Sequence, residues 1–155
     1  MNDLKDLADH LGNIEKEIES AIIKAQRETA ESICRDAKDL APKDTGMYAE
    51  SIHVTDTEVI GKNISTSIVT EATVTAKSNG NEYNLGKLLE EGTDPHEIRP
   101  VEASVLHFQI DGEDIFAKLV HHPGFAPLPH FAPALWLNED VYQENMGKVL
   151  DKEFK

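Results

Sequence analysis

A long apolar stripe at the start of the chain constrains the fold more than any other feature. Its members recur at spacings of three or four, or near multiples of these: Leu4, Leu7, Leu11, Ile14, Ile18, Ile22, Ala25, Ile33, Ala37 and Leu40. Such spacing is typical of one helix face, so residues 1–41 are expected to form an N-terminal helix, periodic from residue 3, with a break at Gly12-Asn13. The helix would be roughly 60 Å long, longer than a small domain, so part of it should project or pack on a neighbouring molecule.

The pattern changes after Pro42, which ends the helix because proline lacks an amide donor and disfavours helical geometry in the residue before it. Runs rich in Ile, Val and Thr predict strands within a sheet-rich core over residues 47–122: 51–55, 64–70, 72–76, 105–110 and 114–120. Tight turns are expected at 61–63 and at 111–113, and a turn or flexible loop around Asn79-Gly80 within 77–84.

Two further helices complete the prediction. LGKLLEEG predicts a short helix near residues 85–91 with Gly92 as its C-terminal cap. A second apolar stripe that begins at Pro133 predicts a C-terminal helix over residues 133–152. The chain is therefore expected to be a single α+β domain over residues 1–155, an antiparallel sheet packed by the long N-terminal helix and the C-terminal helix.

Charge and hydropathy exclude several functions. The formal net charge is -14, from 29 acidic and 15 basic residues, which disfavours binding to nucleic acid phosphates and excludes a conventional, sequence-specific DNA-binding role. The acidic residues concentrate between positions 90 and 114, where Arg99 alone opposes eight of them, so one face is expected to be strongly negative. The sequence has neither a basic leader followed by an apolar run nor a stretch of about 20 apolar residues, so we expect no export and no membrane span.

Three groups of residues could carry chemistry. The single cysteine, Cys34, lies on the apolar side of the first helix and is expected to be a buried, inert thiol. Asp44-Thr45-Gly46 matches the short signature of aspartic proteases, but it follows a helix and a polar pair instead of an apolar strand, so a local turn is the better interpretation.

The third group is a set of histidines that raises the possibility of a metal site, namely His96, His107, His121, His122 and His130. On a strand His121 and His122 would point to opposite faces, and HEIRP has a proline where a zinc-peptidase helix needs its second histidine. We therefore expect no metal and no cofactor. The run HPGFAPLP is better explained as a stiff loop that presents Phe125, Leu128 and Phe131 in fixed directions.

The order of four motifs resembles the small head-tail joining family of long-tailed bacteriophages, also called neck or tail-completion proteins. The resemblance spans roughly residues 25–140, and its parts are the helix-end turn, an EGT segment, an HPG stretch and the entry into the last helix. The matching residues are Ala41, Pro42, Thr45, Gly46 and Ser51; Glu91, Gly92 and Thr93; His121 or His122 with Pro123 and Gly124; and Pro129, Phe131, Pro133 and Ala134. His130 departs from the family's pattern, because it separates Pro129 from Phe131.

The resemblance implies a non-enzymatic virion component at the neck or tail. Such a subunit would form a ring with copies of itself, six-fold or a multiple of six, between the head connector and the tail proteins, after assembly in the cytoplasm of a bacterial host. Phe125 and Phe131 are then candidate anchors, one in the subunit's own core and one at an interface. The acidic residues Glu90, Glu91, Asp94 and Glu97 would line the lumen and repel passing DNA. The alternatives are a metal-dependent hydrolase that uses the histidines and a generic cytoplasmic adaptor.

Overall fold

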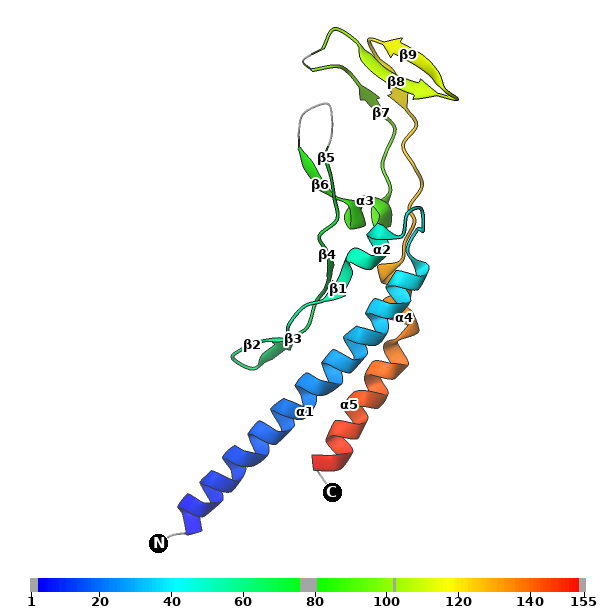
Figure 1. The fold of residues 1–155 in the computed structure, drawn as a ribbon. Coiled ribbons are helices and arrows are strands. Elements are labelled where there is room, and N and C mark those ends of the chain that lie inside the picture. The colour runs from blue at the N-terminus through cyan, green and yellow to red at the C-terminus, as the bar shows by residue number, and fades with distance from the viewer. Residues whose placement is uncertain (1–2, 76–80, 102, 154–155) are drawn as a thin grey trace. The chain divides into compact units, whose positions relative to one another are not determined.

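The computed structural model describes residues 3–75, 81–101 and 103–153, and it confirms an α+β protein (Figure 1). The chain divides into two compact units. The helical unit comprises residues 1–69 and 130–155, and the hairpin unit comprises residues 70–129. No helix in the described part of the chain is long and apolar enough to cross a membrane.

The helical unit is built on α1 (Asp3–Leu40), which is continuous. The predicted break at Gly12-Asn13 is therefore wrong. A glycine inside a helix costs only about 1 kcal/mol relative to alanine, and the apolar stripe continues on both sides of it. The helix ends before Pro42, as predicted, and the amide of Ala41 still donates to the carbonyl of Ala37 at 2.9 Å.

The C-terminal helix is not one element but two, α4 (Phe131–Leu137) and α5 (Glu139–Glu153). Asn138 separates them, because its buried side chain turns back to donate to the carbonyl of Ala134 at 2.9 Å and to Asp36 Oδ2 at 2.6 Å. Further along, Asn145 Nδ2 donates to Thr29 Oγ1 at 3.1 Å. These bonds show that α5 runs antiparallel to α1, beside which it lies in Figure 1.

The core of the helical unit lies where the end of α1 meets the next segments of the chain. Cys34, Ala41, Ala49 and the fully buried Ile52 form the buried cluster, and Tyr48, Val54, Ile68 and Phe131 pack against it. The short helix α2 (Met47–Ser51) leads into β1 (Ile52–Val54), which pairs with β4 (Ile68–Thr70). Between them, β2 (Glu58–Ile60) and β3 (Asn63–Ser65) form a hairpin that turns at Gly61, whose φ is 64°.

The hairpin unit contains the other strands and α3 (Leu85–Glu91). Strand β5 (Thr73–Thr75) pairs with β6 (Glu82–Asn84), and β7 (His96–Ile98) pairs with β10 (Val120–His122). The hairpin of β8 (Leu106–Ile110) and β9 (Glu113–Ala117) turns at Asp111-Gly112, with φ values of 51° and 85°. This is the tight turn that the sequence predicts.

Some of the predicted turns, caps and strands are confirmed by the structure, and others are wrong. Gly92 caps α3 with a φ of 73°, as expected. The predicted turn at Asn79-Gly80 lies outside the described residues. The run 64–70 is not one strand but parts of β3 and β4, and the described strands form separate two-stranded sheets instead of one sheet. Strands of three to five residues, several exposed along their whole length, bury too little surface to hold a larger sheet together.

Candidate functional site

Two motifs that are far apart in the sequence meet in the hairpin unit. The amide of Thr93 donates to the carbonyl of Phe125, and the amide of Phe125 donates to the carbonyl of Thr93, both at 3.1 Å. The amide of Leu128 also donates to the carbonyl of Leu89 at 2.7 Å. We call residues 91–93 and 123–125 together the motif clasp. It joins the EGT and HPG segments into one backbone-to-backbone contact.

Two glycines make this close approach possible. Gly124 has a φ of 75°, and a Cβ atom added to it would lie 2.0 Å from the carbonyl oxygen of Thr93. Gly92 has a φ of 73°, and its Cβ would lie 2.6 Å from the carbonyl oxygen of Phe125. Both positions need a left-handed backbone and the absence of a side chain. The glycines of the two motifs therefore have a shared structural role.

A second junction joins the helix-end turn to the entry into α4, within the helical unit. Tyr48 Oη and His130 Nε2 are 2.6 Å apart, and His130 is fully buried. Phe131 follows it and packs against the core cluster, while Pro133 lies in the first turn of α4. His130, which interrupts the family's Pro-Phe pair, is thus an internal packing residue, and no sequence spacing could reveal a partner 82 residues away.

The helix-end turn itself has the geometry expected of a local turn. Thr45 Oγ1 accepts a hydrogen bond from the amide of Met47 at 3.4 Å, and Gly46 has a φ of 83°. Asp44 is exposed. Cys34 is buried, with its Sγ 3.7 Å from the carbonyl oxygen of Ile52, and burial raises the pKa of the thiol.

The histidines are distributed over different places. His122 stacks on His96 across β10 and β7 with ring centroids 5.0 Å apart, whereas His121 Nδ1 lies 3.6 Å from Glu97 Oε1. The two adjacent histidines therefore have different neighbours, as strand alternation requires. His107 lies on another hairpin, 2.9 Å from Asp114. Within residues 3–75, 81–101 and 103–153, no three His, Cys, Asp or Glu side chains gather closely enough to hold a metal.

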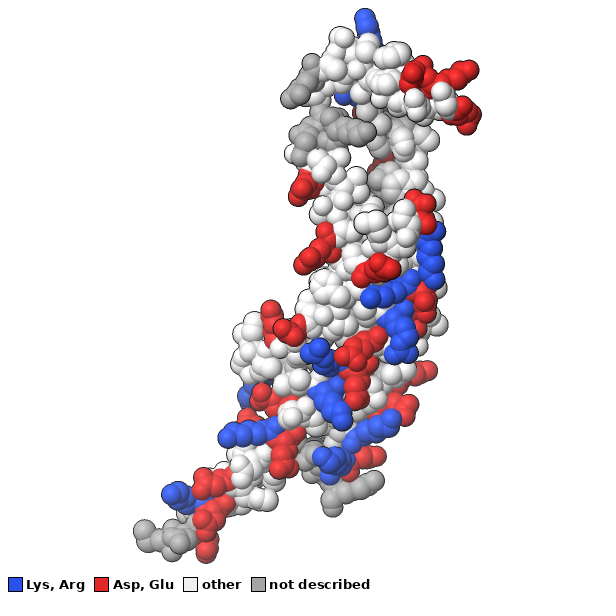
Figure 2. Space-filling model, viewed as in Figure 1, with Lys and Arg blue, Asp and Glu red and all other residues white. Residues whose placement is uncertain are grey.

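Among the acidic residues of the hairpin unit, Glu90 is half-buried, whereas Glu91 and Glu97 are exposed. Glu91 Oε2 is 4.0 Å from Lys87 Nζ, and Asp94 is exposed. Arg99 donates to Glu97 at 2.8 Å, and this hydrogen bond and charge hold the pKa of Glu97 below its usual value. Asp114 also has a lowered pKa, because Gln109 and His107 donate to it at 2.9 Å. Figure 2 shows a group of acidic side chains over the β8–β9 hairpin.

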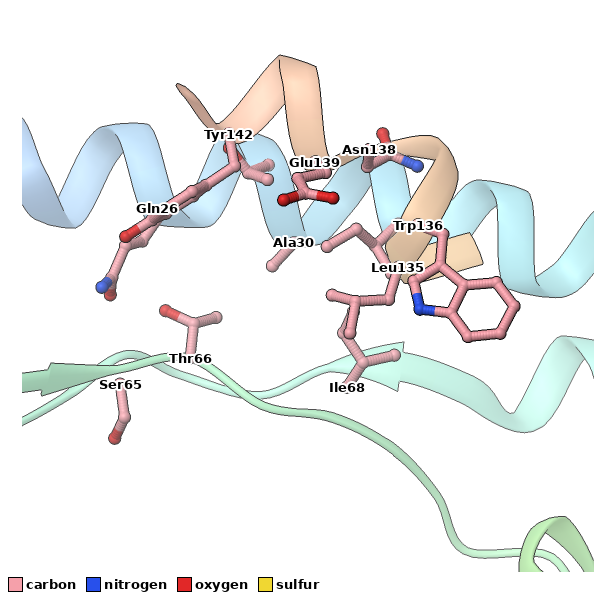
Figure 3. Close-up of a pocket in the computed structure, with 12 residues that line it drawn as sticks. Gln26, Ala30, Ser65, Thr66, Ile68, Leu135, Trp136, Asn138, Glu139 and Tyr142 are labelled. Atoms are coloured by element: carbon pink, nitrogen blue, oxygen red, sulfur yellow. The ribbon is translucent and has the colours of Figure 1, made fainter. Parts of the chain in front are cut away.

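The helical unit also has an open groove that sequence reasoning missed. It has a volume of about 630 Å³ and lies between α1, the β3–β4 segment and the α4–α5 pair (Figure 3). Its walls include Ala30, Ile33, Ile68, Leu135, Trp136 and Tyr142.

Large apolar side chains at the edge of this groove face solvent. Trp136, the only tryptophan, is 71% exposed, and its neighbours Leu135 and Leu137 are 57% and 65% exposed. We call these three residues the LWL patch. Three consecutive large apolar residues on a helix cannot all face one core, and this was the available sequence signal. An exposed patch of this kind beside a groove is typical of a contact surface.

Comparison with known proteins gives one match. The model of a family described as "Bacteriophage HK97-gp10, putative tail-component" matches residues 5–92, more than half of the chain. The matched segment runs from α1 to the cap of α3 and includes Glu91 and Gly92 of the motif clasp. No curated protein and no solved structure is significantly similar to this chain.

Proposed function

Because the chain belongs to the HK97-gp10-like family of bacteriophage tail components, we propose that it joins head and tail by assembling as a ring between the connector and the tail tube. The family supports a structural role in the virion tail. In this proposal the subunit catalyses nothing. It contacts copies of itself in six-fold symmetry or a multiple of it, and it contacts connector and tail proteins after assembly in the host cytoplasm.

The LWL patch beside the groove is the observation that carries ring assembly. A ring closes through a heterologous contact, in which one patch of a subunit meets a different patch of the next. Exposed Trp and Leu side chains supply the apolar centre that such contacts need. The groove, whose walls include Leu135 and Trp136, extends this apolar surface, and its volume lies within the roughly 300–1,000 Å³ typical of binding clefts.

The two candidate phenylalanines receive different roles under this proposal. Phe131 packs against the core cluster of the helical unit, so it is assigned to the subunit's own stability. Phe125 is 39% exposed although its backbone is fixed by the motif clasp, so it is assigned to an interface. The clasp, together with Pro123 and Pro129, holds the direction of this side chain and lowers the entropy lost on docking.

We assign Glu90, Glu91, Asp94 and Glu97 to the lumen of the ring. Negative charge there would repel DNA phosphates and let the genome pass without adhering. Replacing the four residues with lysine should slow genome passage while rings still form. The measurement is the infectivity of complemented particles together with their ring occupancy, and normal infectivity would contradict the lumen assignment.

Ring assembly itself is tested with Trp136→Ala in particles that lack the wild-type subunit. Removing a central aromatic anchor should lower incorporation into particles by roughly 30-fold or more, the effect of an interface hot spot of about 2 kcal/mol. The matched control is Ile60→Ala, because Ile60 is 70% exposed but is not among the residues that line the groove. Equal incorporation of both variants would contradict the role of the LWL patch.

A further inference from the structure

The first half of α1 extends beyond the helix that covers the second half. Asn138 lies beside Asp36, and Asn145 lies beside Thr29. A step of seven residues toward the C-terminus, from Asn138 to Asn145, therefore matches a step of seven residues back along α1. The same register carries residue 153, the last that the structure describes, to the level of about residue 21 of α1. Within the described residues, α5 therefore does not reach the segment 3–20.

The apolar face that α5 covers continues into this segment. Leu4, Leu7, Leu11, Ile14 and Ile18 alternate at spacings of three and four, the heptad pattern of helices that pack on another helix. The first three are 82%, 52% and 57% exposed. We call these five residues the leucine stripe. This spacing fits helix-to-helix packing, so the element that would cover the stripe is itself a helix.

The side chains next to the stripe indicate the charge of that helix. In the heptad frame that places Leu4 at position a and Leu7 at position d, the flanking e and g positions hold Asp3, Ala8, His10, Glu15 and Glu17. Three carboxylates thus border the stripe without a lysine or arginine. The two lysines of the segment, Lys5 and Lys16, fall on the outer face. Charges at flanking positions select the partner of a helix pair by attraction to the opposite sign.

A second copy of this chain is a poor match. Another leucine stripe brings the same carboxylates and no lysine or arginine at the flanking positions. The groove of another copy is lined by Glu139 and, among the residues that line it, by no lysine or arginine. Neither surface complements the negative border of the stripe.

We propose that the leucine stripe is a docking site for an amphipathic helix of a different protein, one with lysine or arginine on both sides of its apolar face. This inference goes beyond ring assembly, because it uses a different surface and a different partner. It gives the tail component a second contact: the LWL patch meets a copy of the chain, and the leucine stripe holds a basic helix.

The test uses the full-length protein and two synthetic heptad peptides with identical apolar positions. One peptide carries lysine at every flanking position and the other carries glutamate. The lysine peptide should bind about tenfold or more tightly in low salt, and the preference should shrink as added salt screens the charges. Replacing Asp3, Glu15 and Glu17 with lysine should reverse the preference. Fluorescence anisotropy of labelled peptides measures both affinities.

Two variants separate the stripe from general acidity. Leu7→Gln/Leu11→Gln keeps every charge and should abolish binding of both peptides, while circular dichroism shows that the helix remains. Leu40→Gln, which alters an exposed leucine at the other end of α1, should bind as the wild type does. Equal affinity for the two peptides in the wild type, or binding that survives in the stripe variant, would refute the proposal.

Sedimentation velocity distinguishes this inference from the proposed function. If the stripe variant loses self-association, a second copy is the occupant and the inference fails. If the stripe variant assembles normally but no longer binds either peptide, the inference stands. If Trp136→Ala also assembles normally, ring assembly through the LWL patch fails while the leucine stripe keeps its assignment.

Discussion

Replacing Gly124 with alanine should open the motif clasp. The new Cβ would lie 2.0 Å from the carbonyl oxygen of Thr93 and 2.8 Å from the carbonyl carbon of Asp94, so the two backbones must move apart. The paired hydrogen bonds between Thr93 and Phe125 would then be lost, at about 1 kcal/mol each. The left-handed backbone adds about 1 kcal/mol for any side chain. The whole effect is about 3 kcal/mol.

Gly112→Ala is the matched control for this substitution. Gly112 has a φ of 85°, close to that of Gly124, but its Cβ would meet nothing within 4 Å. It should carry only the backbone penalty of about 1 kcal/mol. The difference between the two variants therefore isolates the contact with Thr93.

Amide hydrogen exchange at Thr93 and Phe125 is the appropriate assay, because the effect is local. Losing two hydrogen bonds, about 2 kcal/mol, should raise the exchange rate of both amides roughly 30-fold in Gly124→Ala. In Gly112→Ala both rates should stay as in the wild type. Unchanged exchange at Thr93 and Phe125 in Gly124→Ala would show that the clasp does not depend on close backbone approach.

Three further predictions concern the helical unit. Tyr48→Phe removes the hydroxyl that bonds a fully buried histidine and should lower the free energy of unfolding by about 1–3 kcal/mol. Tyr142→Phe, at a residue that is 43% exposed, should change the free energy of unfolding by less than about 0.5 kcal/mol. Denaturant titration followed by tryptophan fluorescence compares the two variants, and equal losses of stability would refute the role of the hydrogen bond. Ile52→Ala should cost about 2–5 kcal/mol because Ile52 is fully buried, and the same titration should find Ile60→Ala near the wild type. Burial raises the pKa of Cys34, so the folded protein favours the protonated thiol. The contribution of this thiol to the stability of the fold should be full below the usual thiol pKa and should be lost as the pH rises through the raised pKa of the folded state. Iodoacetamide should label Cys34 more slowly in the native than in the unfolded chain, and equal labelling rates would contradict burial.

The parts of the fold that sequence patterns predict are those fixed by local interactions. The stripe that begins at Leu4 specifies α1, Gly92 ends α3, and Asp111-Gly112 turns the β8–β9 hairpin. Each of these depends on residues within one or two turns of each other. The prediction failed at Gly12, where a local helix breaker is outweighed by the apolar pattern on both sides.

The contacts that organise the candidate sites depend on residues distant in sequence, and spacing alone does not reveal them. The sequence marks both glycines of the motif clasp, but only the structure brings Gly92 and Gly124 together. His130 had no visible partner until the fold placed it beside Tyr48. The groove could not be predicted either, because it forms where α1, α4 and the β3–β4 segment meet.

Electron cryo-microscopy of particles that carry a tagged copy of this chain tests the central claim most directly. We expect a closed ring of this subunit between the head connector and the tail tube, with six-fold symmetry or a multiple of it, and with the LWL patch buried against the neighbouring copy. A junction that lacks this chain, or one in which Trp136 of every copy faces solvent, would contradict it.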